Sequence, residues 1–348
     1  MSSAPILTFH IIYVPGSVEH LLPFVPGLLR WSDCRFRLVA NNCTPMEVEM
    51  LHTFADRQPR VEVLVLPTNR PLTHHDALNY LQARCQEEHF CFMDSDILAA
   101  GPFMTDIAVD LAAHSATFAG SPLWMRPCDR LFHPHFDVVC GEHDQTSAGL
   151  PLGGTFFAIY DNRVLSDFIR QSGMGFEMRG FSQLPPPLQA WCAEHGLAGP
   201  RHYYDTAKSL NLGLLQAGHT LAVRDSPQLY HLGGLSFIAK RAWYDRQKGL
   251  SGRWGAFYRT ARSAYTGLRR RIKNDPVNRS RKLPFGRRRR VYGPYFTALL
   301  TALADGRKPP PLPAEDDAGV RRRAQAATEQ ILAATRAWAA QNGRETGQ

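Results

Sequence analysis

The sequence predicts an α/β protein with a Rossmann-like, mostly parallel central sheet. Three observations support this. Short apolar runs alternate with segments that carry apolar residues at helical spacing from the start of the chain to residue 96. The run Phe-Cys-Phe-Met at 90–93 has no polar alternation, which is typical of a strand buried on both faces. Polar residues directly follow several of these runs, at the sheet edge where open α/β sheets bind ligands.

The first half of the chain supplies most of the expected elements. They are a strand over 6–14, a helical segment over 18–31 that Pro23 and Pro26 disturb, a strand over 36–40, a helix over 45–54, a strand over 61–66, a helix from 73 to about 84, and the apolar strand that begins at 90. Further strands are expected over 117–122 and 221–230, with a Gly-rich turn and strand over 153–160 and a helix that ends near 217. The stretch 124–151 is expected to be a long, functional loop.

Asp94 and Asp96 follow the apolar strand with one residue between them. Carboxylates are hard oxygen donors, and no Cys-x-x-Cys motif occurs, so the pair favours Mg²⁺ or Mn²⁺ over zinc. A metal held there would most naturally carry phosphates. From this stretch alone, an Asp pair that only caps a turn remains an alternative.

The order of these motifs resembles the GT-A fold glycosyltransferases, particularly the family 2-like nucleotide-sugar enzymes. The resemblance covers roughly residues 5–240. It comprises the second strand ending in Asn41 and Asn42, a third strand followed by a polar helix bearing His and Asn, and the segment Phe-Met-Asp-Ser-Asp-Ile at 92–97. It implies a metal-dependent enzyme that moves a sugar from a nucleotide-diphosphate donor to an acceptor hydroxyl. The acceptor would be a glycan, a lipid-linked molecule or another hydroxyl compound.

The resemblance also assigns roles at the donor site. Asn41 and Asn42 would lie near the base or ribose of the donor. Asp94 would hold ribose and metal, and Asp96 is the stronger candidate for a direct metal ligand. His231 would complete the metal and diphosphate site; the alternative is a surface histidine.

The remaining roles concern the acceptor. Gly153 and Gly154 would let a sugar or acceptor approach the backbone, and the alternative is a β-bulge without a ligand. Asp205 would be the general base, which implies inversion at the anomeric carbon; the alternative is a helix N-cap.

The sequence predicts three parts: a catalytic domain over 1–240, a basic helical arm with aromatic residues over 241–305, and a Pro-rich linker with an amphipathic terminal helix over 306–348. Residues 240–290 hold eighteen Lys or Arg and two acids. The formal net charge of the whole chain is +9, so the rest of the chain is net acidic.

Within the arm, seven apolar residues fall on one helical face: Trp254, Phe257, Tyr258, Ala261, Tyr265, Leu268 and Ile272. A basic amphipathic helix of this kind is typical of an element that binds an anionic membrane surface. The alternative is a helix packed on the catalytic domain. The run 287–290, four arginines, could meet lipid phosphate or nucleic acid. In the terminal helix, one apolar face is marked by Val320, Ala324, Ala327, Ile331, Ala334 and Trp338. This helix would dock on the body or on another subunit.

No apolar run approaches eighteen residues and no signal-peptide pattern is present, so we expect a cytoplasmic protein, possibly peripheral at the inner face of the membrane. One rival function is a nucleotidyltransferase, which should show a Gly-rich, basic loop after the first strand, but residues 15–19 contain no Lys or Arg. The other is nucleic-acid binding through the basic arm, which leaves the acidic strand end unexplained, so nucleic acid is an unlikely partner.

Overall fold

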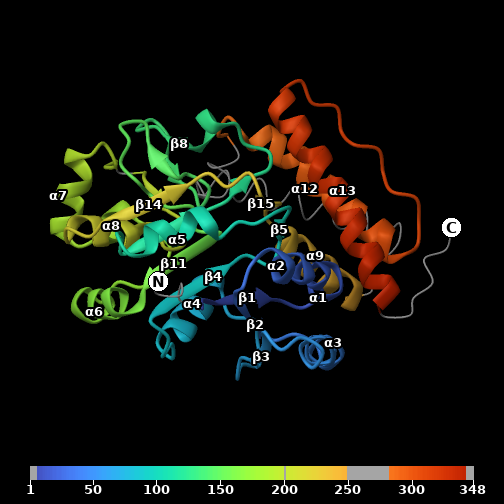
Figure 1. The fold of residues 1–348 in the computed structure, drawn as a ribbon. Coiled ribbons are helices and arrows are strands. Elements are labelled where there is room, and N and C mark those ends of the chain that lie inside the picture. The colour runs from blue at the N-terminus through green and yellow to red at the C-terminus, as the bar shows by residue number, and fades with distance from the viewer. Residues whose placement is uncertain (1–5, 200, 249–281, 342–348) are drawn as a thin grey trace.

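A computed structural model describes residues 6–199, 201–248 and 282–341. Within these ranges a seven-stranded sheet forms the centre, in the order β14-β6-β11-β4-β1-β2-β3 (Figure 1). Its strands are β1 Thr8–Tyr13, β2 Arg35–Ala40, β3 Val61–Val65, β4 His89–Met93, β6 Ala116–Ala119, β11 Phe157–Asp161 and β14 Leu221–Arg224. Strand β11 runs antiparallel to both of its neighbours, whereas every other adjacent pair is parallel. The predicted α/β class with a mostly parallel sheet is confirmed.

Strand β4 is buried on both faces, as its unbroken apolar run predicts. Phe90 and Phe92 pack with helices α4 His74–Gln82, α6 Asn162–Ser172 and α8 Lys208–Gln216 on one face. Cys91 and Met93 pack on the other face with α1 Val18–Leu21, α2 Val25–Trp31 and the C-terminal helices. All four side chains are at most 1% exposed. The two carboxylates that follow β4 are therefore carried by a fixed strand.

Local signals explain the helices of the N-terminal half. Helix α3 Pro45–Ala55 begins with a capping box between Thr44 and Glu47. Thr73 caps α4 by accepting a hydrogen bond from the backbone of Asp76. The predicted helical segment over 18–31 is interrupted by the short 3₁₀ turn η1 Leu22–Phe24, because proline disturbs the regular helix.

The runs 117–122 and 221–230 were expected to be single strands, and this expectation is wrong. Gly120 adopts φ 109°, which turns the chain between β6 and β7 Ser121–Pro122. The second run divides into β14 and β15 Leu229–His231. Strands β7 and β15 form a separate three-stranded sheet with β5 Ile97–Ala99, in the order β5-β15-β7. This small sheet positions the candidate site described below.

The segment 124–151 is more ordered than a loop. It contains η2 Pro127–Arg130, β8 Leu131–Phe132, β9 Val138–Val139 and β10 Gln145–Thr146. It packs against β12 Arg179–Gly180, η3 Phe181–Gln183, α7 Pro186–Glu194 and β13 Tyr203–Tyr204 around a third apolar cluster. Elsewhere in the fold, α5 Thr105–Leu111 lies beside β6.

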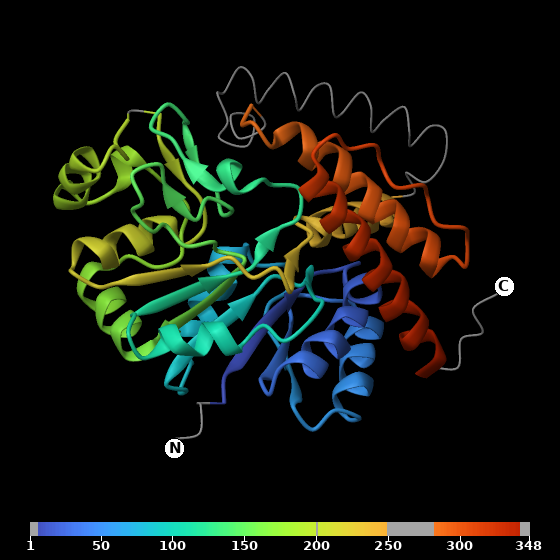
Figure 2. The same cartoon turned by 45° about the horizontal axis from the view of Figure 1, so that its top comes forward.

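The C-terminal part consists of three described helices: α9 Leu235–Gln247, α12 Gly286–Ala304 and α13 Ala318–Gln341. The predicted boundary at 240/241 falls inside α9. The predicted aromatic face over 254–272 lies outside the described residues. Figure 2 shows α12 and α13 side by side against the N-terminal helices. In the described part of the chain, no helix is both long enough and apolar enough to cross a bilayer.

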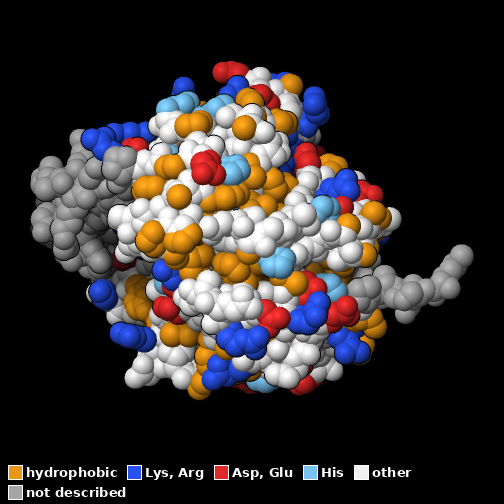
Figure 3. Space-filling model, turned by 90° about the vertical axis from the view of Figure 1, so that its left-hand side faces the viewer, with side chains coloured by type: hydrophobic (Ala, Val, Ile, Leu, Met, Phe, Trp, Pro, Cys, Tyr) orange, Lys and Arg blue, Asp and Glu red, His pale blue; other side chains and the backbone are white. Residues whose placement is uncertain are grey.

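The terminal helix α13 docks on the body. Val320, Ala324, Ala327 and Ile331 are fully buried, as their spacing on one helical face predicts. Near its end, the Trp338 ring lies 5.4 Å from the Phe54 ring of α3. Basic and acidic side chains are interspersed on the face shown in Figure 3, so neither sign forms a continuous field there.

Candidate active site

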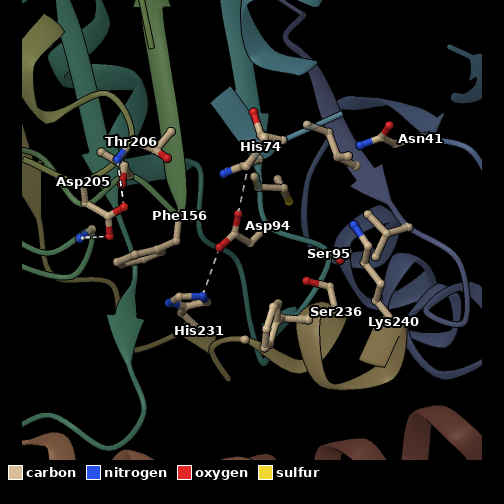
Figure 4. Close-up of a pocket in the computed structure, with 18 of the residues that line it drawn as sticks. Asn41, His74, Asp94, Ser95, Phe156, Asp205, Thr206, His231, Ser236 and Lys240 are labelled. Carbon is tan, nitrogen blue, oxygen red and sulfur yellow. Dashed lines mark hydrogen bonds and ion pairs between the residues drawn. The ribbon is translucent and has the colours of Figure 1, made fainter. Parts of the chain in front are cut away.

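A cavity of about 320 Å³ opens beyond the carboxyl ends of the central strands (Figure 4). Ile12 and Asn41 reach it from the ends of β1 and β2, and Asp94 follows β4. Asp205 and His231 line it from the second half of the chain. The carboxyl edge of a parallel sheet is where α/β proteins bind ligands, so the cavity lies where the sequence predicts it.

Asp94, Asp96 and His231, the three predicted metal ligands, come together. One ligand atom from each lies within 4.8 Å of the other two. His231 Nε2 is 3.2 Å from Asp94 Oδ2 and 3.5 Å from Asp96 Oδ1. Within the described residues, the buried Nδ1 of His231 has no hydrogen-bond partner. The two carboxylates suit Mn²⁺ or Mg²⁺ in their donor chemistry, and the imidazole favours Mn²⁺ of the two, so this cluster could hold one of the expected cations.

The electrostatics of the cluster show how strongly the three groups interact. Burial alone would lower the pKa of His231, but its close contacts with Asp94 and Asp96 and their negative charges outweigh burial and raise the pKa to about 10. Burial would raise the pKa of Asp96, but His231 and the Leu235 N–H hold it below its usual range. The cluster therefore favours charged carboxylates beside a positive partner, which in the absence of a cation is the imidazolium.

Packing fixes the ring of His231. It stacks on Phe156 at 4.4 Å with an interplanar angle of 14°, and the Trp124 ring lies 5.9 Å away. Gly233 adopts φ 71°, and a Cβ at this position would overlap the Trp124 ring. Glycine is thus required both for the turn and for the close approach of Trp124.

The small sheet connects His231 to Asp96. Strands β15 and β5 pair antiparallel with His231 opposite Ile97. The Leu232 N–H donates to the backbone oxygen of Asp96 at 3.1 Å, and the Leu235 N–H donates to Asp96 Oδ2 at 2.9 Å. The Asp96 side chain is 2% exposed, whereas that of Asp94 is 30% exposed and lines the cavity. Asp94 is therefore the more accessible of the two carboxylates.

A second histidine, which the sequence did not single out as a ligand, flanks Asp94. His74 Nε2 lies 3.6 Å from Asp94 Oδ1, so Asp94 is held between His74 and His231 (Figure 4). His74 is the first residue of α4. In the sequence, the polar residues at the start of this helix were the signal that could have indicated His74 as a site residue.

Asp205 lies in the cavity on the other side of Phe156 from Asp94 (Figure 4). The alternative that it caps the following helix is wrong, because α8 is preceded by Ala207 at φ 64° and has no side-chain cap. Its carboxylate instead accepts hydrogen bonds from the Gly141 N–H at 3.1 Å and the Thr206 N–H at 2.9 Å. Burial and the charge of Glu142 raise the pKa of Asp205.

Two cations that line the cavity were not predicted from the sequence as site residues. Lys240 reaches it from α9 and Arg289 from α12. Arg289 Nη1 lies 3.2 Å from the buried Glu142 Oε1, and the Arg289 guanidinium lies 5.7 Å from the Trp124 ring. Positions 142 and 289 are far apart in sequence, so no local pattern could have paired them.

The neighbouring Arg288 also points inward. Arg288 pairs with Asp129 at 3.3 Å and with Glu315 at 3.2 Å. The expectation that the whole run 287–290 faces lipid or nucleic acid is therefore corrected for Arg288 and Arg289, which form ion pairs within the protein.

The predicted donor asparagines differ in placement. Asn41 lines the cavity, but its amide already donates to the Leu72 carbonyl at 3.1 Å and accepts from the Leu72 N–H at 2.9 Å. Asn42 adopts φ 58° and is not among the cavity-lining residues described. Asn41 thus anchors the chain at residue 72, and nucleotide contacts by Asn41 and Asn42 stay a prediction.

Gly153 and Gly154 lie outside the residues described as lining the cavity. A Cβ at Gly153, where φ is 70°, would come within 2.6 Å of the Phe118 ring. A Cβ at Gly154 would come within 2.8 Å of Asp144 Oδ1. Packing therefore explains both glycines, and their role toward a sugar stays a prediction.

Comparison with known proteins gives structural matches only. No protein-family description matches the sequence, and no curated protein matches it. Similar solved structures include the glycosyltransferase GlyE of Streptococcus pneumoniae TIGR4, with a TM-score of 0.36, 13% identity and coverage of 63% of this chain and 45% of GlyE. The match thus spans less than half of GlyE.

Two further structures are similar to this chain. The active-site mutant Q189E of LgtC matches with a TM-score of 0.37 and 9% identity, over 64% of this chain and 74% of LgtC. TarS of S. aureus matches with a TM-score of 0.33 and 15% identity, over 61% of this chain and 39% of TarS. Glycosyltransferases are thus among the solved structures to which this chain is similar.

The metal cluster predicts a specific pattern of Mn²⁺ binding. Asp94→Ala and His231→Ala each remove one ligand, so Mn²⁺ affinity should fall by at least about tenfold. Electron paramagnetic resonance of free Mn²⁺ during titration measures this directly. Asp106→Ala removes an exposed carboxylate of α5 and is the matched control. Equal Mn²⁺ affinity in all four proteins would contradict the site.

Proposed function

We propose that this protein is a metal-dependent glycosyltransferase that moves a sugar from a nucleotide-diphosphate donor to an acceptor hydroxyl. One observation carries the proposal. A single cavity at the carboxyl edge of the sheet is lined by Asp94 and His231 of the Asp94–Asp96–His231 cluster, by the cations Lys240 and Arg289, and by the separate carboxylate of Asp205. A diphosphate leaving group needs positive charge, and an acceptor hydroxyl needs a base.

At the donor end, Asp94, Asp96 and His231 would hold Mn²⁺ or Mg²⁺. When bound, the cation supplies Lewis-acid neutralisation of the charge that builds on the departing diphosphate. Arg289 and Lys240 add fixed positive charge on the walls of the same cavity. The charge of Glu142 keeps the pKa of Arg289 above its ordinary value, so Arg289 is a permanent cation at this wall.

At the acceptor end, Asp205 would take the proton of the attacking hydroxyl. Its two backbone hydrogen bonds hold the carboxylate in place, and its raised pKa makes it a stronger base than an exposed aspartate. A base that activates the acceptor for direct displacement implies inversion at the anomeric carbon. The phenyl ring of Phe156, between Asp205 and Asp94, separates the two ends of the cavity (Figure 4).

The nucleotidyltransferase alternative would require a phosphate-binding loop after β1. The loop at Gly16 is closed instead: its N–H donates to Glu47 Oε1 at 2.7 Å, and a Cβ there would overlap the Trp243 side chain of α9. The Gly16 N–H is therefore already bound and not available to a phosphate, and sugar transfer is the function that the site supports better.

A nucleotide sugar should stabilise the protein in the presence of Mn²⁺. In a thermal-shift screen of nucleoside diphosphates and nucleotide sugars, a ligand at a hundred times its dissociation constant adds about 2.7 kcal/mol. Excess EDTA should remove most of this stabilisation, and Asp94→Ala should show little of it. If no nucleotide sugar shifts the unfolding temperature, or if the shift is the same in EDTA, the proposed donor is wrong.

The base assignment predicts a selective loss of turnover. Asp205→Asn keeps the size of the side chain but removes its proton acceptor, so kcat should fall by about 10² to 10⁴ with donor affinity little changed. Asp106→Asn is the control. Proton NMR of the product reports its anomeric configuration, and a retained configuration would overturn the inverting mechanism even if turnover fell.

Arg289 should matter more than its neighbours in sequence. Arg289→Gln removes a cation from the cavity wall, and affinity for the nucleoside diphosphate should fall by about tenfold or more, since a hydrogen bond to a charged group contributes about 1.5–3 kcal/mol. Arg287→Gln changes an exposed arginine of the same helix and is the matched control. Equal diphosphate affinity of the two variants by calorimetry would exclude Arg289 from donor binding.

A further inference from the structure

A second cavity, of about 790 Å³, lies between the C-terminal helices and the N-terminal helices. Most of its apolar lining comes from four elements, η1, α3, α12 and α13. The larger apolar side chains there are Pro23, Met50, Leu300, Leu303, Leu332 and Trp338. These side chains, contributed by elements far apart in sequence, line one cavity together, and we call them the apolar floor.

Cations surround this floor. Arg307 and Lys308 follow the end of α12, and Arg336 lies on α13. All three are exposed. Arg307 pairs with Asp305 at 2.6 Å, whereas Lys308 and Arg336 have no acidic partner within the described ranges. Glu19 is the acidic side chain described at this cavity, so the balance of charge around the opening is positive.

The second cavity is separate from the candidate active site. The described linings of the two cavities have no residue in common. Arg289 lies in the first turn of α12 and Leu303 in its last turn. At 1.5 Å of rise per residue these positions are roughly 21 Å apart along the helix.

Two segments of this chain outside the described residues are poor occupants on chemical grounds. Residues 342–348 follow α13 directly, but their sequence, Asn-Gly-Arg-Glu-Thr-Gly-Gln, has no apolar side chain for the floor. Residues 249–281 contain aromatic residues but also nine Lys or Arg against one acid. A segment with that charge would be repelled by a cationic opening.

We propose that this cavity binds a lipid phosphate, with its hydrocarbon chain on the apolar floor and its phosphate at Arg307, Lys308 and Arg336. The two ends of such a molecule match the two kinds of surface: hydrocarbon leaves water for the floor, and the phosphate accepts charge-assisted hydrogen bonds from guanidinium and ammonium groups. The site is independent of the proposed sugar transfer, because it shares no described residue with the active-site cavity.

The test is isothermal titration calorimetry with the full chain. The titrant is n-dodecyl phosphate, kept below its micellar concentration. We expect saturable binding of one molecule per chain, at least tenfold tighter than binding of inorganic phosphate or of dodecyl maltoside, which has the same hydrocarbon chain and a neutral head. The double variant K308Q/R336Q should lose at least tenfold in affinity. Thr335→Trp, which adds bulk to a residue of the lining, should also lose binding.

Two controls keep the result specific. Arg322→Gln changes an exposed arginine elsewhere on α13 and should bind dodecyl phosphate as the unchanged protein does. Lys240→Gln, a change in the active-site cavity that breaks no ion pair described in the structure, should also keep the affinity. A loss there would place the phosphate in the active-site cavity and overturn the proposal. Equal binding of the neutral and anionic amphiphiles, equal binding by K308Q/R336Q, or no saturable binding would overturn it as well. Thermal melts of each variant confirm that it is folded.

Discussion

The pairing of β15 with β5 is the constraint on which the rest of the site depends. It sets residues 229–231 against 97–99 and thereby brings His231 to Asp96 across more than a hundred residues of chain. Asp96 is almost wholly buried, and a buried carboxylate is costly unless its charge is compensated. His231 and the Leu235 N–H provide that compensation. The same contact fixes the start of α9, which carries Lys240 into the cavity.

The sequence predicts the parts of this fold that depend on local pattern. The run 90–93 predicts a strand buried on both faces, because the residues that point to either face of the sheet are all apolar. The spacing of Val320, Ala324, Ala327 and Ile331 predicts a helix with one buried face, and these four residues are buried. The spacing alone left open whether that face meets the body or another subunit. Asp94 and Asp96 were identified because a strand end and a pair of donors are adjacent in sequence.

Features that depend on distant partners could not be predicted in this way. The antiparallel direction of β11 is set by its neighbours β4 and β6. The division of 221–230 into two strands depends on pairing with two different sheets. Arg289 belonged to a run of like charges, and composition alone does not show that one member meets the buried Glu142. Counting charges gives the sign of a segment but not the direction of each side chain.

The ion pair between Glu142 and Arg289 has a consequence for how the protein is made. Ribosomes synthesise a chain from its N-terminus. All three residues of the Asp–Asp–His cluster are therefore present once residue 231 has emerged, whereas Arg289 emerges almost sixty residues later. Until then Glu142 lacks this cation, and an uncompensated buried acid is destabilising. The wall of the cavity at Glu142 is therefore complete only when the C-terminal helices dock, which is later than the point at which the three residues of the Asp–Asp–His cluster have all been synthesised.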